Sequence, residues 1–175
     1  MSDGYGQFDG EVVAKWCRDP NQPDRNMVLM EKLTYVDPKG NSWVASEHRK
    51  INGASIPDAL WSAWLGTPFV GDYRRATVVH DIACDDRAEP SAAVHKMFYY
   101  AMRCDGVPKF RAVPMYVAVS LFGPRWDAAG LLPSESIAPE KIWALEQAVE
   151  QAFGKYGFDA DIDVLEQAVR ESLGK

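Results

Sequence analysis

The first half of the chain carries hydrophobic residues in the partial alternation that is typical of β-strands. Aromatic and β-branched residues concentrate in three stretches that turn-forming residues separate: 8–16, 27–36 and 42–48. The segment from Asp37 to Asn41 between the last two stretches contains Pro, Gly and Asn, which favour a tight reversal. The pattern therefore predicts an antiparallel sheet of three or more strands, with a hairpin between the second and the third.

From residue 57 onward the hydrophobic period becomes that of a helix. Six helices are expected, over about 57–65, 72–85, 91–104, 112–122, 139–153 and 160–173. Asp72 and Ser91 are the expected N-caps of the second and third helices, and the fourth should begin near Pro114. That fourth helix is apolar on all sides, which predicts a place in the core.

Strands followed by helices, without strand–helix alternation, predict an α+β fold in which an N-terminal antiparallel sheet packs on a helical half. We expect residues 1–130 to form one α+β domain. Residues 131–175 should add an amphipathic helical hairpin, whose two helices share the pentamer Leu-Glu-Gln-Ala-Val. This hairpin either packs on its own seam or serves as a docking arm for a protein partner.

Composition narrows the class of protein. The 175 residues are 47% hydrophobic and 25% charged, as in a soluble globular domain. A net charge of −6 argues against nucleic-acid binding. Three cysteines without a CxxC pair favour a reducing compartment. The N-terminus shows no pattern of a secretory signal, and the longest apolar run, 115–122, is too short to span a membrane.

The most unusual local pattern is His80-Asp81 inside an apolar helical stretch, because a carboxylate there needs a cation, a metal or hydrogen bonds. His95 lies on the next helix, and a short connection should bring it level with His80. Two imidazoles and a carboxylate suit a divalent ion, with His80 and Asp81 as ligands. Alternatively, one imidazole is a general base and the other fixes its tautomer. A third interpretation is a core histidine satisfied by hydrogen bonds.

Two further groups lie near this pattern in the sequence. The turn Asn52-Gly53-Ala54-Ser55-Ile56-Pro57 presents Asn52 and Ser55 as candidate substrate-binding groups, although as a turn it needs no function. Ser55 as a nucleophile would need a histidine in reach. Cys84 shares a helix face with His80, and a cysteine in a helix interior is more often a small buried hydrophobic residue than a nucleophile.

The order NGASIP, LW, HD, a helix that ends in AM, and a hydrophobic helix that ends in FG followed by Trp resembles a family of uncharacterised proteins of tailed bacteriophages and prophages. The resemblance covers about residues 8–126. Ser55, Ile56, Pro57, His80 and Asp81 match the family pattern. The chain departs from that pattern where Asn52 stands for Asp, Cys84 for Tyr and His95 for Asp.

The helix pair of that family also looks like the core of phospholipase A2. This resemblance implies His80 as base, Asp81 as a calcium ligand and His95 in the place of the aspartate that orients the base. Gly66 to Gly71 is the only candidate for the calcium loop. The resemblance leaves Ca²⁺ or Zn²⁺ as the expected cofactor, and the host cytoplasm or the phage virion as the expected location.

Two hypotheses follow from these patterns. In the first, the chain is a hydrolase, with or without a metal, that acts on lipid or cell-envelope material. His80, Asp81 and His95 then form the catalytic centre, with Asn52 and Ser55 on the substrate. In the second, the chain is a non-enzymatic phage virion, tail or host-interaction protein, and the His-Asp pair is a buried network that ties the NGASIP turn to the helices.

Overall fold

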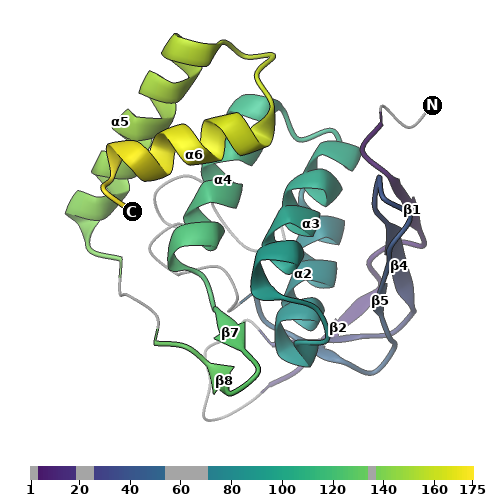
Figure 1. The fold of residues 1–175 in the computed structure, drawn as a ribbon. Helices are drawn as coiled ribbons and strands as arrows, with labels where there is room; N and C mark the ends of the chain where they lie inside the picture. Colours follow the sequence, from purple (N-terminus) through teal and green to yellow (C-terminus); the bar gives the residue numbers. More distant parts are fainter. Residues whose placement is uncertain (1–3, 19–25, 54–70, 134–136) are drawn as a thin grey trace.

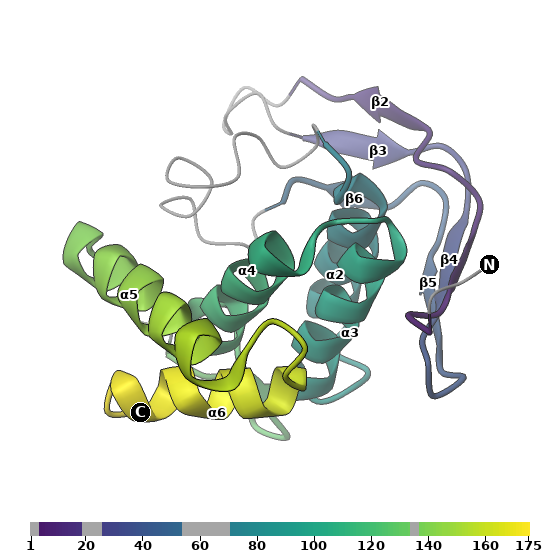
Figure 2. The same ribbon diagram turned by 90° about the horizontal axis from the view of Figure 1, so that it is seen from above.

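The computed structural model describes residues 4–18, 26–53, 71–133 and 137–175. Strands precede helices along the chain, which confirms the predicted α+β class. In Figures 1 and 2 the sheet lies on one side, α2 and α3 lie next to it, and the remaining helices lie beyond them. The helices are α2 (Arg74–Asp86), α3 (Ser91–Cys104), α4 (Lys109–Phe122), α5 (Pro139–Tyr156) and α6 (Ile162–Ser172). The helix expected at 57–65 lies outside the described residues.

Each of the three long strands in the structure is broken into two short strands, and the second half of the third lies beyond the expected stretch 42–48. They are β1 (Gln7–Asp9) with β2 (Ala14–Trp16), β3 (Met27–Leu29) with β4 (Leu33–Val36), and β5 (Ser42–Ala45) with β6 (Lys50–Ile51). The halves form two antiparallel sheets, in the orders β1-β4-β5 and β2-β3-β6. The register does not change between them, because Gln7 pairs with Val36 and Trp16 with Met27 in one continuous series. The molecule therefore has one three-stranded ribbon with a bend in the middle.

The bend has a backbone cause that the hydrophobic pattern does not show. Gly10 has a φ of +97°, and a Cβ atom there would lie 2.9 Å from the carbonyl oxygen of Lys32 on the neighbouring strand. His48 also has a positive φ, of 66°, at the corresponding break in the third strand. Such angles are unfavourable for most side chains, and they turn the ribbon around α2.

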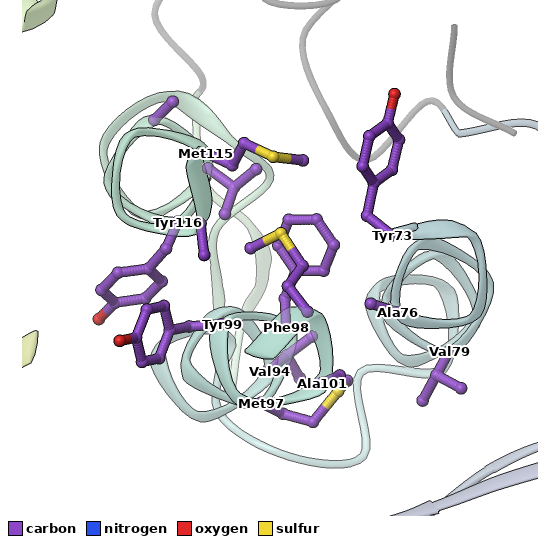
Figure 3. Packing of buried hydrophobic residues seen from close by; sticks show 14 of the residues in the cluster. Tyr73, Ala76, Val79, Val94, Met97, Phe98, Tyr99, Ala101, Met115 and Tyr116 are labelled. Atoms are coloured by element: carbon purple, nitrogen blue, oxygen red, sulfur yellow. The ribbon is translucent and has the colours of Figure 1, made fainter. Parts of the chain in front are cut away.

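The hydrophobic core is one cluster of buried residues that extends from the strands through α2, α3 and α4 to α5 and α6. Figure 3 shows Phe98, Val94 and Met97 of α3 close to Ala76 of α2, with Met115 of α4 on the other side. Nine residues of α4 are buried, which confirms that this helix lies in the core. Among the described helices, none is long and apolar enough to cross a membrane.

Helix starts were predicted less well than helix positions. α4 begins at Lys109, so Pro114 lies inside the helix and does not mark its start. The N-cap of α3 is Pro90 instead of Ser91, and that of α2 is Tyr73 instead of Asp72, neither with a capping side-chain hydrogen bond. Tertiary packing sets these ends more than capping chemistry does. In the expected loop after Trp126, the strands β7 (Trp126–Asp127) and β8 (Gly130–Leu131) form a small hairpin.

The C-terminal helices α5 and α6 form the predicted pair, and Glu166 holds α6 to the rest of the molecule. Its carboxylate accepts hydrogen bonds from Tyr116 and Ser120 of α4 and from Arg170 of α6. Lys96 of α3 forms an ion pair with the same carboxylate at 3.4 Å. Burial alone would raise the pKa of Glu166, but these donors hold the pKa below the ordinary value.

We expect Glu166→Ala to lower the free energy of unfolding by about 2 kcal/mol at pH 7, because buried donors lose their acceptor. A group with a lowered folded-state pKa stabilises the protein above its unfolded pKa, and this contribution is lost as the pH falls through the folded value. Urea denaturation at pH 7 and pH 3.5 measures both effects. The exposed Glu171→Ala is the control, and equal losses in both variants at pH 7 would contradict the prediction.

Candidate functional site

His80 of α2 and His95 of α3 are brought together by the short connection between the two helices. Residues 87–90 join α2 to α3, and the helices run side by side in Figure 1. The Nε2 atom of His80 lies 2.9 Å from the Nδ1 atom of His95. This confirms the predicted proximity of the two histidines.

The second ring nitrogen of His95 determines how protons are placed in this pair. Nε2 of His95 lies 3.0 Å from the carbonyl oxygen of Pro124, and a carbonyl only accepts hydrogen bonds. His95 must therefore carry its proton on Nε2, which leaves Nδ1 as an acceptor. His80 in turn donates from Nε2, and its own Nδ1 keeps a lone pair. Within the described part of the chain, this buried Nδ1 atom has no hydrogen-bond partner.

Burial keeps both imidazoles neutral. His80 is 0% exposed and His95 is 2% exposed. Burial lowers the pKa of His95 to about 4. The pKa of His80 is well below that of an ordinary histidine, because of burial and then because of His95. The ring of Phe98 stacks on His80 at a centroid distance of 4.5 Å. A single proton therefore lies between the rings at neutral pH.

Asp81 has partners in the loop that follows β6. Its Oδ2 atom accepts the backbone N–H groups of Asn52 at 2.9 Å and of Gly53 at 3.2 Å. Asp81 is only 3% exposed, so these bonds are a large part of what satisfies its charge. Asn52 thus meets the predicted site through its main chain. Ser55, the other predicted substrate-binding residue, lies outside the described residues.

Cys84 is the residue that sequence reasoning underrated. Its Sγ atom lies 3.6 Å from Nε2 of His80, and it forms no disulfide. Among the described residues, one group could hold a metal ion through at least three side chains: His80, Cys84 and His95, whose ligand atoms all lie within 4.8 Å of one another. Asp81, the predicted metal ligand, is not in this group. The spacing of four residues between His80 and Cys84 was the available indication.

A separate groove lies between α4 and α5. It has a volume of about 810 Å³, and its lining includes Phe110, Met115, Phe153 and Phe158. None of the predicted site residues that the structure describes lines it. In the described structure the histidine pair and this groove are therefore distinct features.

Comparison with known proteins places the chain in a family. Residues 27–119, just over half of the chain, match the family model described as "Protein of unknown function (DUF1353)". The chain belongs to this family. The prediction of an uncharacterised family is thereby confirmed. The DUF1353 match contains His80, Asp81, Cys84 and His95, whereas Pro124 and the helices α5 and α6 lie beyond it.

Two relatives come from Sinorhizobium fredii (strain NBRC 101917 / NGR234). The uncharacterized protein y4jT is 40% identical over 98 residues, which are 56% of this chain and 29% of y4jT. The uncharacterized protein y4iH is 38% identical over 114 residues, or 65% of this chain and 46% of y4iH. The chain thus spans less than half the length of either relative. No solved structure matches the chain.

Proposed function

We propose that this DUF1353 protein is a hydrolase in which His80 is the general base. The observation that carries the proposal is the hydrogen-bond chain from His80 to His95 to the carbonyl of Pro124. This chain fixes the tautomer of His80 and leaves the lone pair of its Nδ1 atom available. A base that is oriented by a second side chain in this way suits general-base catalysis.

In the reaction we propose, Nδ1 of His80 takes a proton from a water molecule. The water oxygen forms a bond to the acyl carbon of an ester, the bond from that carbon to the alcohol oxygen breaks, and the imidazolium returns the proton to the departing alcohol. His95 stays hydrogen-bonded to Nε2 of His80 throughout and stabilises the imidazolium. His80 is fully buried, so the reaction requires the side chains that cover it to move when substrate binds.

The substrate class we propose is lipid or other cell-envelope material, and the setting is a phage-type protein in the host cytoplasm or in a virion. The support is the resemblance of the helix pair to phospholipase A2, where a histidine on one helix is oriented by a side chain on an antiparallel helix. In this chain α2 provides His80 and α3 provides His95. Fold resemblance alone does not determine a reaction, so the substrate must be tested directly.

The test compares three proteins on vesicles of phosphatidylethanolamine and on vesicles of phosphatidylglycerol, whose acyl esters are the bonds that the proposed step breaks, all with EDTA present. We expect the unmodified protein to release fatty acid, and His80→Gln to lower the rate by about 10²- to 10⁴-fold, the usual contribution of a general base. Glutamine keeps a donor near the Nε2 position, so the fold should persist. His48→Asn is the control, because His48 is exposed and has the positive φ that asparagine tolerates. If the unmodified protein hydrolyses neither lipid, the proposal is overturned.

The second candidate is a non-enzymatic phage virion, tail or host-interaction protein. Complete burial of His80 and the hydrogen bonds that Asp81 accepts from the backbone of Asn52 and Gly53 favour it, because buried hydrogen bonds of this kind rigidify a fold. A partner would then bind elsewhere, with the C-terminal hairpin as the predicted surface. On this hypothesis His80→Gln changes thermal stability and leaves no enzymatic rate to lose.

A further inference from the structure

We propose that His80, Cys84 and His95 form a binding site for a zinc-class transition-metal ion, with the His80 Nε2, Cys84 Sγ and His95 Nδ1 atoms as ligands. The three side chains come from two turns of α2 and one turn of α3, and all three are buried. Two imidazoles and a thiolate bind zinc, cobalt and copper in preference to calcium or magnesium.

Two of the three distances between the ligand atoms are close to those of a tetrahedral site, and the third, between Cys84 and His95, is bounded only by the 4.8 Å within which all ligand atoms lie. Bond lengths of about 2.05 Å from zinc to nitrogen and about 2.3 Å from zinc to sulfur place nitrogen and sulfur about 3.6 Å apart, and two nitrogens about 3.3 Å apart. Nε2 of His80 and Sγ of Cys84 are already at 3.6 Å. Nε2 of His80 and Nδ1 of His95 are at 2.9 Å and have to separate by about 0.4 Å. Small side-chain rotations of this kind are within reach of the rings.

The surroundings of His95 have the form found at metal-binding histidines. Metal-ligating histidines usually donate their other ring N–H to a backbone carbonyl or a carboxylate, which fixes the ring and its tautomer. Nε2 of His95 donates to the carbonyl of Pro124, so the lone pair of Nδ1 is directed at the proposed ion. His80 contributes a second, independent observation, because its Nδ1 atom is buried without a partner in the described residues and can accept a proton when the metal takes Nε2.

Metal binding has a definite proton balance. The ion takes lone pairs from two nitrogens and one thiolate, so the thiol proton of Cys84 leaves for solvent. The proton on Nε2 of His80 moves to Nδ1, so the imidazole stays neutral. Nδ1 then carries a proton and cannot act as a base. One consequence rests on the proposed function. If His80 is the general base, a bound metal blocks hydrolysis.

The test is titration of the metal-free protein with Co²⁺ under reducing conditions, followed by displacement with Zn²⁺. We expect a thiolate-to-cobalt charge-transfer band that saturates at about one ion per chain. Calorimetry in buffers of different ionisation enthalpy should show release of about one proton per ion. Cys84→Ser should remove the band and weaken zinc binding at least tenfold. Cys17→Ser should change neither, because Cys17 is not part of the cluster.

The outcomes separate this proposal from the hydrolase. If the charge-transfer band requires Cys84 and the protein hydrolyses no substrate, the metal-site proposal is supported and the hydrolase proposal is overturned. Hydrolysis that stops on addition of zinc and returns with EDTA supports both. Absence of the band, or a band of equal strength in Cys84→Ser, overturns the metal site whether or not the protein is an enzyme. His80→Gln removes a second proposed ligand and should also abolish the band. This result would show that the site needs the histidine as well as the cysteine.

Discussion

The variant Asp81→Ala is expected to lower the free energy of unfolding by about 3 kcal/mol, the largest stability loss that we predict for a single change in this chain. A single oxygen of Asp81 accepts the N–H groups of both Asn52 and Gly53. Removing it leaves two donors without this acceptor and opens a cavity in a buried place, and each buried donor without a partner costs about 1–3 kcal/mol. Urea denaturation followed by circular dichroism measures the loss.

Two further variants show whether hydrogen bonding is the cause. Asp81→Asn keeps an oxygen that can accept both N–H groups, so we expect a loss of only about 1 kcal/mol. Asp85→Ala removes an exposed carboxylate from the same helix and should change stability by less than about 0.5 kcal/mol. If asparagine destabilises the protein as much as alanine does, the charge of Asp81 matters more than its geometry.

The fold was predictable where hydrophobic periodicity is strong. The stretches 8–16 and 27–36 match two strands of the ribbon, 42–48 contains the first half of the third, and 91–104 coincides with α3. The bend was not predictable, because it depends on Gly10 approaching the Lys32 carbonyl on another strand. Pro114 was misleading for a related reason. A proline is typical of a helix start, yet the buried face of α4 extends to Ala112, before the proline.

Side-chain positions in the site were predictable, and their main-chain partners were not. Helix spacing was enough to predict that His80 and His95 meet. Nothing in the residue types indicated that Pro124 would offer its carbonyl to His95, or that Asn52 and Gly53 would donate to Asp81. Backbone groups are the same at every position, so only the folded chain shows which of them reach a given side chain.

Cys84 and His95 stand at two positions where the family pattern expected from the sequence has Tyr and Asp. In the structure both side chains contact the same nitrogen of His80. The two departures are therefore not independent surface changes. Together they replace oxygen groups around His80 by a thiol and an imidazole, which are softer metal ligands. For the proposed metal site, we therefore expect zinc to bind in preference to calcium.

The variant His95→Asp is expected to keep the proposed hydrolase active, at or above the unmodified rate, whereas His95→Phe should lower the rate at least tenfold. In aspartate, an oxygen takes nearly the place of Nδ1 of His95, so the hydrogen bond from Nε2 of His80 is kept. The negative charge also stabilises the imidazolium that forms when His80 takes a proton. Phenylalanine fills the volume of the imidazole ring and offers no acceptor, so the tautomer of His80 is no longer fixed.

The stability of His95→Asp should fall although its activity is kept. This difference separates a catalytic role of His95 from a structural one. Aspartate loses the bond to Pro124 and puts a carboxylate into a buried region, so His95→Asp should unfold at a lower temperature than the unmodified protein. Vesicle hydrolysis and thermal melts of both variants give the result. A His95→Asp protein that is less stable and yet at least as active establishes His95 as a positioning residue for His80. If His95→Asp loses as much activity as His95→Phe, the hydrogen bond to Nε2 is not what positions the base, and the hydrolase proposal loses its supporting geometry.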